Sequence, residues 1–383
     1  MPAFARALIE PRHAGAGRPA AGHGAGIARW YTYRIARLLS VELLRTFKQL
    51  GDAPLPLHVF WAETAGLFDG ETPSSVAAVA SALREKLTRE RGAFSAPCPG
   101  WPGARHHSPD LMWAAPSAEA MLRGEGLPVL SELHPGVNTF TTLSVLAHAP
   151  DRRLLEREWL RDLGSGGISP IPWEDFARSS QDARLAKDHW HLDLGFDFDS
   201  ERPANRVLRA ADCTVRRVGK GLVVTRGRQR FDLWEVFERR IRLKAASAFS
   251  LGTGLPTGPR RLLGGVVIER AHWRFEAADL RWLDDELNRV ERAAAFREAH
   301  RLPRRVFLRS PTEVKPLYLD WHSPILLDLL ARLSRQAPWL SFSEMLPGPD
   351  ELWLRDAKGA RYVCELRSIA VDPVPWSSKA VWS

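Results

Sequence analysis

Cysteine is scarce in this chain, and its scarcity excludes two kinds of framework. Only three cysteines, Cys98, Cys213 and Cys364, occur in 383 residues. Their number is odd, they lie far apart and none forms a CxxC pair, so neither structural disulfides nor a cysteine-based zinc site is expected. This usage is typical of a reducing compartment, and we expect a cytoplasmic protein.

Long apolar runs are also lacking. No stretch of about 18 consecutive apolar residues occurs, which excludes a transmembrane helix. The first 26 residues are rich in Gly, Ala, Pro and Arg and contain no continuous apolar segment of the kind that a secretory signal needs. We expect residues 1–26 to be disordered or unrelated to the rest of the chain.

Several well-known motifs are missing as well. The sequence contains no GxSxG elbow, no Walker lysine and no GxGxxG turn, so serine hydrolases, P-loop NTPases and dinucleotide enzymes find no support. His189 and His191 could face one side of a strand, but the sequence places no third ligand near them. The neighbours His106 and His107 would point apart on any regular element. We therefore expect no bound metal and no organic cofactor.

What the chain has in excess is arginine. Lys and Arg number 54 against 45 acidic residues, which gives a formal net charge of +9. Arginine forks match phosphate geometry and basic surfaces attract polyanions, so nucleic acid is a candidate partner. An ordinary solvated surface of an arginine-rich chain is an equally valid interpretation. The candidate contacts crowd one short stretch: Arg216, Arg217, Lys220, Arg226, Arg228 and Arg230.

Apolar periodicity predicts the elements of the first part of the chain. Residues 29–50 and 72–87 carry helical patterns, the second with Pro73 in its first turn. Residues 129–134 are strand-like, and a helical pattern resumes over 138–150. A loop is expected around residues 100–110.

The second part predicts strands and helices in alternation. Because residues 164–206 are polar and loop-rich, we divide the chain into a first part, 27–163, and a second part, 164–383. The elements expected in the second part are a hairpin over 213–227 with its turn at 219–221, a helix over 233–246, a linker over 252–259, a strand over 264–269, a long amphipathic helix over 280–294, a strand over 305–309, a helix over 324–335, and a hairpin of 352–355 with 362–369. The fold class is therefore α+β, with mixed, partly antiparallel sheets and packed amphipathic helices.

Charged residues within apolar strands form the second group of candidates. Glu344 lies in SFSEML, and Glu365 and Arg367 lie in YVCELRSI. Strand alternation places Glu365 and Arg367 on one face, and a buried charge must be paired because its desolvation costs several kcal/mol. Either these residues form internal salt bridges, or they line a polar crevice that receives an anionic ligand.

Four segments resemble the class I lantibiotic dehydratase family. They are GWPGARHHSPDLMWAA at 100–115, VLSELHPGVNTFTTLSVLAHAPD at 129–151, LPRRVFLRSPTEVKPLYLDWHSPILLDLLARL at 302–333 and SFSEMLPGPDELWLRDAKGARYVCELR at 341–367. The resemblance begins near Ala28 and extends over the remaining chain. Its specific features are the order Asp-Trp-His-Ser-Pro, the order EMLP-P-LW and the final ELR.

The resemblance implies an activity and its partners. Such dehydratases transfer glutamate from glutamyl-tRNA to Ser or Thr of a ribosomally made precursor peptide, and a separate domain then eliminates it during lanthipeptide biosynthesis. The chain resembles the latter part of the N-terminal, glutamylation region. It is thus expected to be a fragment or split subunit, with the upstream half and the elimination domain on separate chains. A homo-oligomer and a peripheral position at the membrane within a biosynthetic complex are compatible with this interpretation.

The resemblance also suggests a site but assigns no catalytic role. Arg105, His107, Ser108 and Asp110 match the family pattern, whereas His106 departs from its usual aromatic residue. Arginine could hold a phosphate or carboxylate in its fork, and Asp110 could orient His107; pairing of Asp110 with Arg105 is the structural alternative. The full candidate anion or substrate site comprises Arg105, His107, Ser108, Asp110, His134, Asn138, Glu344, Glu365 and Arg367.

Two hypotheses of different classes remain open. In the first, the chain belongs to a tRNA-dependent glutamylating enzyme with glutamyl-tRNA as co-substrate. In the second, it is a non-catalytic module that binds tRNA or a partner subunit, or a degenerate remnant of such an enzyme. The sequence also predicts that Glu344, Glu365 and Arg367 line one crevice together with residues 105–110.

Overall fold

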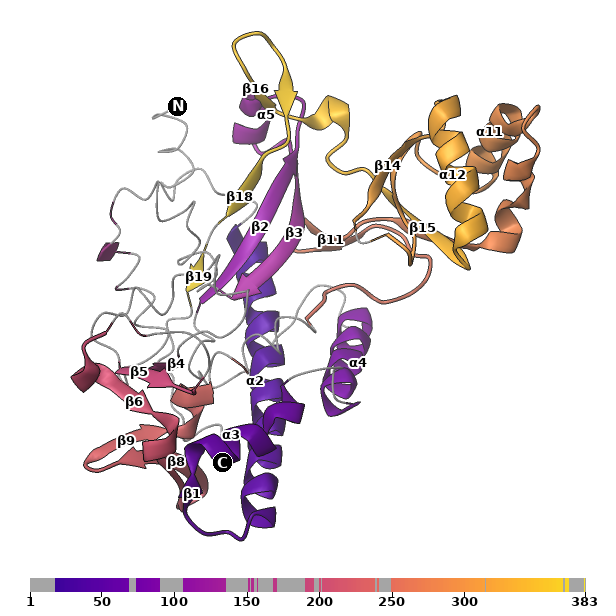
Figure 1. The fold of residues 1–383 in the computed structure, drawn as a ribbon. Coiled ribbons are helices and arrows are strands. Elements are labelled where there is room, and N and C mark those ends of the chain that lie inside the picture. Colours follow the sequence, from indigo (N-terminus) through magenta and orange to yellow (C-terminus); the bar gives the residue numbers. More distant parts are fainter. Residues whose placement is uncertain are drawn as a thin grey trace. The chain divides into compact units, whose positions relative to one another are not determined.

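The computed structural model describes residues 18–68, 74–89, 106–135, 151, 153–154, 157, 168–170, 190–195, 200, 202–237, 240, 249–313, 315–367, 369–371 and 382. Its elements form an α+β fold, as predicted (Figure 1). The chain divides into two compact units that are both discontinuous in sequence. The first unit is Met1–Ala20, Leu111–Ser131 and Leu251–Leu366, and the second is Ala21–Asp110, Glu132–Ser250 and Arg367–Ser383.

Helices form much of the second unit. Helix α2 spans Arg18–Gln49, α3 spans Leu57–Glu63 and α4 spans Ser74–Arg89. The start of α2 corrects the expectation for residues 1–26, of which 18–26 are helical. Alanine and arginine are good helix formers, so a helix that packs over its later turns extends readily into this stretch. The core of the unit includes the rings of Phe47, Phe60 and Phe237, which pack edge to face.

An antiparallel sheet in the second unit confirms the hairpin predicted over 213–227. Its strands are β1 (Leu55–Pro56), β7 (Thr214–Val218), β8 (Gly221–Arg226) and β9 (Gln229–Asp232), in the order β1-β7-β8-β9. Both tight turns begin with a glycine at positive φ, Gly219 at 61° and Gly227 at 58°, a conformation that favours glycine. A small parallel sheet consists of β4 (Ile168–Pro170), β5 (Trp190–Asp193) and β6 (Val207–Arg209). After β9, residues 233–237 and 240 are helical, and 3-10 turns occupy Ala65–Leu67, Ala204–Arg206 and Ala210–Asp212.

A mixed sheet carries the candidate site. It has the strand order β10-β11-β3-β2-β18, and β19 pairs with β2 as well. The strands are β2 (His106–Ala114), β3 (Leu127–Pro135), β10 (Arg261–Leu263), β11 (Val266–Glu269), β18 (Glu365–Arg367) and β19 (Ala370–Val371), with helix α5 (Ala118–Leu122) between β2 and β3. Residues 106–110 therefore lie in a strand, not in the expected loop. Strand pairing on both sides of β2 outweighs the turn-forming tendency of Pro109.

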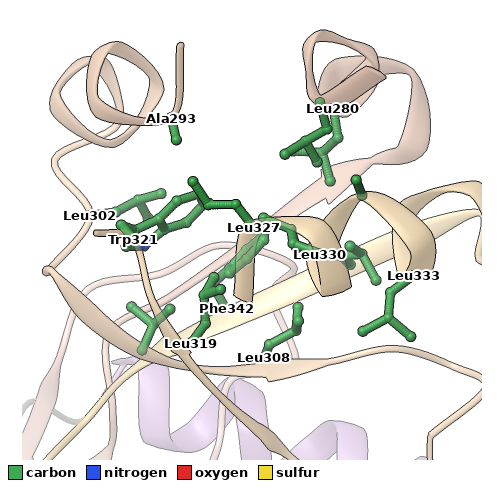
Figure 2. Close-up of a cluster of buried hydrophobic side chains, with 14 of the residues drawn as sticks. Leu280, Ala293, Leu302, Leu308, Leu319, Trp321, Leu327, Leu330, Leu333 and Phe342 are labelled. Carbon is green, nitrogen blue, oxygen red and sulfur yellow. The ribbon is translucent and has the colours of Figure 1, made fainter. Parts of the chain in front are cut away.

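A second sheet of the first unit packs against helices on one face. Its strands are β12 (His272–Glu276), β13 (Arg305–Arg309), β14 (Leu317–Asp320) and β15 (Trp339–Glu344), all antiparallel in the order β12-β15-β13-β14. Helix α11 (Arg289–Ala299) and helix α12 (Pro324–Gln336) cover the sheet (Figure 1). In Figure 2 the leucines of α12 point toward Leu308, Leu319 and Phe342 of the strands. Ser323 caps α12 by accepting the N–H of Leu326 at 3.5 Å, and Pro324 occupies its first turn, as helix-start chemistry favours.

The prediction of one long helix over residues 280–294 is wrong. A 3-10 helix occupies Ala277–Asp284, and α11 begins only at Arg289. Leu280 and Leu283 are buried, but Leu287 is 96% exposed. The carboxylate of Asp285 accepts hydrogen bonds from the backbone and side-chain amides of Asn288, which closes a turn between the two segments.

The predicted C-terminal hairpin is confirmed but shorter than expected. Strands β16 (Leu354–Arg355) and β17 (Arg361–Tyr362) pair across the turn of residues 356–359, where Asp356 accepts the N–H groups of Lys358 and Ala360. Leu352 bridges to Ala114 instead of extending the hairpin. Trp353 packs against Ala115 and Met121 and does not join the α12 core.

Candidate functional site

Strand β2 carries three buried polar side chains within four residues. Strand alternation turns Ser108 and Asp110 to one face and His107 to the other, against the expectation that Asp110 orients His107. His107, Ser108 and Asp110 are 4%, 0% and 1% exposed. The strand is flanked by β3 on one side and by β18 and β19 on the other, so both of its edges are paired. Buried polar groups at this density are retained only where partners stabilise them. β2 is therefore the best-defined polar element among the candidates.

The described partner of Asp110 comes from β18. Nη2 of Arg367 lies 3.2 Å from Oδ2 of Asp110, while the Arg367 side chain keeps 39% of its surface exposed. The structure thus brings together two sequence candidates that are far apart along the chain. A guanidinium held by a buried carboxylate is fixed in direction, and its exposed part remains accessible to an anion.

Glu365 lies on the same face of β18 as Arg367. Both residues are exposed and Leu366 between them is half-buried, so the predicted alternation is confirmed. The Glu365 carboxylate accepts a hydrogen bond of 2.8 Å from Ser131 of β3. The premise that these two charges lie in a buried strand is wrong, because β18 is a short strand with solvent at this face.

Glu344 is satisfied elsewhere in the first unit. It is 7% exposed and binds Arg260 through two hydrogen bonds, of 2.8 Å to Nε and 2.6 Å to Nη2. It also accepts the N–H of Ala271 at 2.9 Å. The bond to Glu344 raises the pKa of Arg260. The energetic reason for placing Glu344 in one crevice with Arg367 therefore disappears, and the convergence of these residues stays a prediction.

The other candidates are described in part or not at all. Arg105 and Asn138 lie outside the described residues, so the expected pairing of Arg105 with Asp110 is untested. For His134, only the backbone is described, in β3. No group of three or more His, Cys, Asp or Glu side chains in the described part of the chain is arranged to hold a metal ion.

The basic residues of the second unit form two groups on one sheet, and all six are exposed. Because β7, β8 and β9 are consecutive antiparallel strands, Arg216, Arg217 and Lys220 lie toward the start of β8, and Arg226, Arg228 and Arg230 lie toward its end. Two of them have acidic neighbours: Arg217 is 3.6 Å from Asp52, and Arg226 is 3.9 Å from Asp212. Exposed pairs of this kind are weak, so both groups can still contact a polyanion.

Sequence reasoning missed a pair of carboxylates at the end of β9, Asp232 and Glu235. Asp232 accepts the N–H of Trp234 at 3.0 Å and the indole N–H of Trp382 at 3.1 Å, and Glu235 accepts the N–H of Asp232 at 3.2 Å. Burial, and then the charge of Asp232, raise the pKa of Glu235 to about 7. The Asp-x-x-Glu spacing of a helix start was the available signal.

Glu235 is expected to make stability pH-dependent. Since its pKa is higher in the folded state than in the unfolded state, the free energy of unfolding falls as pH rises from about 4.5 to about 7, by up to about 3 kcal/mol. Glu235→Gln should remove that fall, which denaturant titrations of both proteins at several pH values would measure. The two pKa values of Glu235 place the effect between roughly pH 4.5 and pH 8. If the free energies of unfolding of the two proteins differ by a constant amount over this range, the assignment is contradicted.

Comparison with known proteins places the fold. Two solved structures of the glutamylation domain TbtB from thiomuracin biosynthesis match 94% of this chain, at 18% identity and a TM-score of 0.57 for the complex with 5'-phosphodesmethylglutamycin and at 19% and 0.56 for the other. The tRNA-dependent lantibiotic dehydratase MibB from Microbispora sp. 107891 matches 78% of the chain at 16% identity and a TM-score of 0.45, covering 30% of that protein.

The sequence comparisons add no nearer relative. No family model and no curated protein matches the chain. Among the helices of the described segments, none is long and apolar enough to cross a membrane. The chain spans about half the length of the solved TbtB domains. Over nearly all of its own length, the chain shares the fold of the TbtB glutamylation domain.

Proposed function

We propose that this chain takes part in tRNA-dependent glutamylation of Ser or Thr residues in a ribosomally made precursor peptide. The observation that carries the proposal is the likeness to the TbtB glutamylation domains over 94% of the chain. The buried polar strand β2 with Arg367 on its neighbour supports it, because fixed hydrogen-bond donors stabilise the oxyanion that forms in acyl transfer to a hydroxyl. The partners proposed for this role are glutamyl-tRNA and the precursor peptide.

The chemistry is the transfer of an acyl group between two oxygens. The hydroxyl oxygen of the peptide attacks the ester carbonyl of glutamyl-tRNA, the bond from that carbonyl carbon to the ribose oxygen breaks, and the hydroxyl proton passes to the ribose oxygen. The ester is already activated, so the protein positions the two substrates and stabilises the oxyanion. No metal or organic cofactor is required.

In this proposal Arg367 contacts the substrate. Its guanidinium, held by Asp110, binds the glutamyl carboxylate, the phosphate of the acceptor end or the developing oxyanion. His107 and Ser108 belong to the same buried strand as Asp110. Arg105, His134 and Asn138 stay candidates for this site on the sequence resemblance. Glu365, tied to Ser131, lies on the same exposed face of β18.

The test is glutamyl transfer by the purified chain. Radiolabelled glutamyl-tRNA and a Ser/Thr-containing precursor peptide are incubated with the chain alone, and with the products of adjacent reading frames. We expect label on the peptide. Hydroxylamine should release this label, because the glutamyl group is attached through an ester bond. No label on the peptide in any combination would overturn the glutamylation role.

A second candidate function is a non-catalytic module that binds tRNA or a partner subunit. It is favoured by the exposed basic residues of the sheet β1-β7-β8-β9. Transfer by the chain alone would rule it out. Binding of tRNA without transfer in any combination would support it.

Arginine replacement tests the tRNA-binding surface. Substituting Arg226, Arg228 and Arg230 by alanine is expected to weaken tRNA binding and to lower the slope of log Kd against log salt by about two to three, because fewer counterions are released. Filter binding over a series of salt concentrations measures both quantities. Arg332→Ala, which removes an exposed arginine of α12, is a matched control. An unchanged slope would assign these arginines to ordinary solvated surface.

A further inference from the structure

The sheet β12-β15-β13-β14 has a second face that helices α11 and α12 do not cover. Residues 255–258 lie along its β12 edge, where Gly258 bridges to His272 and the carbonyl of Leu255 lies 2.9 Å from Nε2 of His272. The residues facing α11 and α12 form the apolar core, including Leu308, Leu340 and Phe342. Strand alternation turns the intervening residues to the opposite face. These are His272, Arg274 and Glu276 of β12, Arg305, Phe307 and Arg309 of β13, Tyr318 and Asp320 of β14, and Trp339, Ser341 and Ser343 of β15. We call this set the open face.

The register places arginine and serine in one row of the open face. Ser341 pairs with Arg274 on one side and with Arg309 on the other. Two strand spacings separate these arginine positions, about 10 Å, with a small hydroxyl side chain between them. Arg274 also stacks on Trp339, its Cζ lying 4.2 Å from the ring centroid. The row is therefore a shallow surface with a cation on each side.

The next row is aromatic. Ser343 pairs with His272 and with Phe307, and Phe307 pairs with Tyr318. Tyr318 is 44% exposed and Phe307 is half-buried. The two adjacent rings beside a small serine are a surface on which a flat ring system can stack. The exposed Tyr318 and the half-buried Phe307 do not belong to the core, which lies on the other face.

The charge of the open face favours an anion. Glu276 is 3.4 Å from Arg274, and Asp320 is held by Arg304 at 3.0 Å and by Arg305 at 3.6 Å. The hydrogen bonds from Arg304 are the largest cause of a lowered pKa of Asp320, and the charge of Arg305 lowers this pKa further. Arg309 adds a cation for which the described residues supply no carboxylate within ion-pair distance. Arg305 also lies 3.8 Å from Asp350. Four arginines therefore stand against three carboxylates, which leaves a small net positive charge next to the rings.

We propose that the open face binds single-stranded RNA, with bases stacked on Tyr318 and Phe307 and phosphates held by Arg309 and Arg274. Polynucleotide single strands are the ligands that combine regularly spaced anions with flat rings, and open sheets with exposed aromatic and basic residues suit them. The inference does not depend on the proposed function, since a chain that fails to transfer glutamate can still bind RNA here.

The experiment is fluorescence anisotropy of a labelled oligouridylate with the full chain at low salt. Tyr318→Ala is expected to raise Kd by roughly tenfold, the usual effect of losing one stacked base. Arg309→Ala should raise Kd by about threefold or more and lower the salt slope by about 0.7, the contribution of one phosphate contact on a single strand. Both side chains are exposed, so both variants should fold, and their melting temperatures check this.

Matched controls separate the open face from general charge and aromatic effects. Tyr362→Ala removes a tyrosine of similar exposure, 49%, on the β16–β17 hairpin, and Arg332→Ala removes an arginine of α12 on the helical side of the sheet. Neither should change Kd by more than about twofold. Heparin, a polyanion without bases, should compete poorly.

Three outcomes would overturn the proposal. If the control variants raise Kd as much as the open-face variants do, the binding depends only on the net charge of the protein. Loss of binding only in the Arg226, Arg228 and Arg230 triple alanine variant would assign the RNA to the basic sheet of the second unit. If the oligouridylate does not bind, RNA is ruled out as the ligand of the open face. A protein segment, such as one from the regions that the longer relatives contain in addition, would then be the candidate.

Discussion

Glutamyl transfer is expected to fall by about two to three orders of magnitude in Arg367→Lys, while the melting temperature changes by only a few degrees. Lysine keeps a positive charge beside the buried carboxylate of Asp110, so the ion pair that supports the fold survives. It lacks the planar fork that can contact Asp110 and an anionic substrate at the same time. Activity and stability should therefore separate in this variant.

Single-turnover transfer assays and thermal melts of the same preparations provide the measurements. Arg355→Lys is the control, since it makes the same change at an exposed strand residue of the first unit. Arg367→Ala should lose transfer and also lower stability, by roughly 1–3 kcal/mol, because the charge beside Asp110 is removed. Full transfer by Arg367→Lys would show that Arg367 only neutralises Asp110.

Phe342→Ala is expected to destabilise the first unit by about 3–5 kcal/mol. Phe342 is fully buried at the centre of the core in Figure 2, with its ring centroid 5.4 Å from that of Trp321 and 5.8 Å from that of Phe275. Truncation removes these contacts and leaves a cavity that three neighbouring elements cannot close without strain.

Denaturant unfolding followed by far-UV circular dichroism measures this loss. Leu287→Ala is the control, because Leu287 is an exposed residue between the two helical segments and its truncation should change stability by less than about 0.5 kcal/mol. A loss below about 1 kcal/mol for Phe342→Ala would mean that the packing of α12 on the sheet is wrong.

Elements with complete local signals were predicted well from the sequence. Helix α12 has an N-cap serine, a proline in its first turn and a regular apolar stripe, and it lies where the pattern placed it. The turns at Gly219 and at residues 356–359 carry their own chemistry, so both hairpins were found. The helix over 280–294 failed because the leucine spacing continued through a turn that Asp285 and Asn288 close.

The sequence proposed members of the candidate site but not their contacts. The alternation of Glu365 and Arg367, and the likeness of residues 100–115 to a known family, drew attention to what the structure shows as β18 and β2. The ion pair of Arg367 with Asp110 depends on the register between β18 and β2, which no local pattern specifies. The partner of Glu344, Arg260, comes from a stretch that the sequence indicated only as the end of a linker.

By itself the sequence determined the α+β class, the elements with strong caps and turns, the excess of arginine and the resemblance to lantibiotic dehydratases. Each of these depends on residues close together in the chain or on motif order. Only the tertiary structure decided that residues 106–110 form a buried strand, which charge pairs with which, and that one sheet keeps an aromatic and basic face open. These features depend on strand register and on burial by distant segments, and the free energy of an ion pair or a stacked ring is realised only once that register is set.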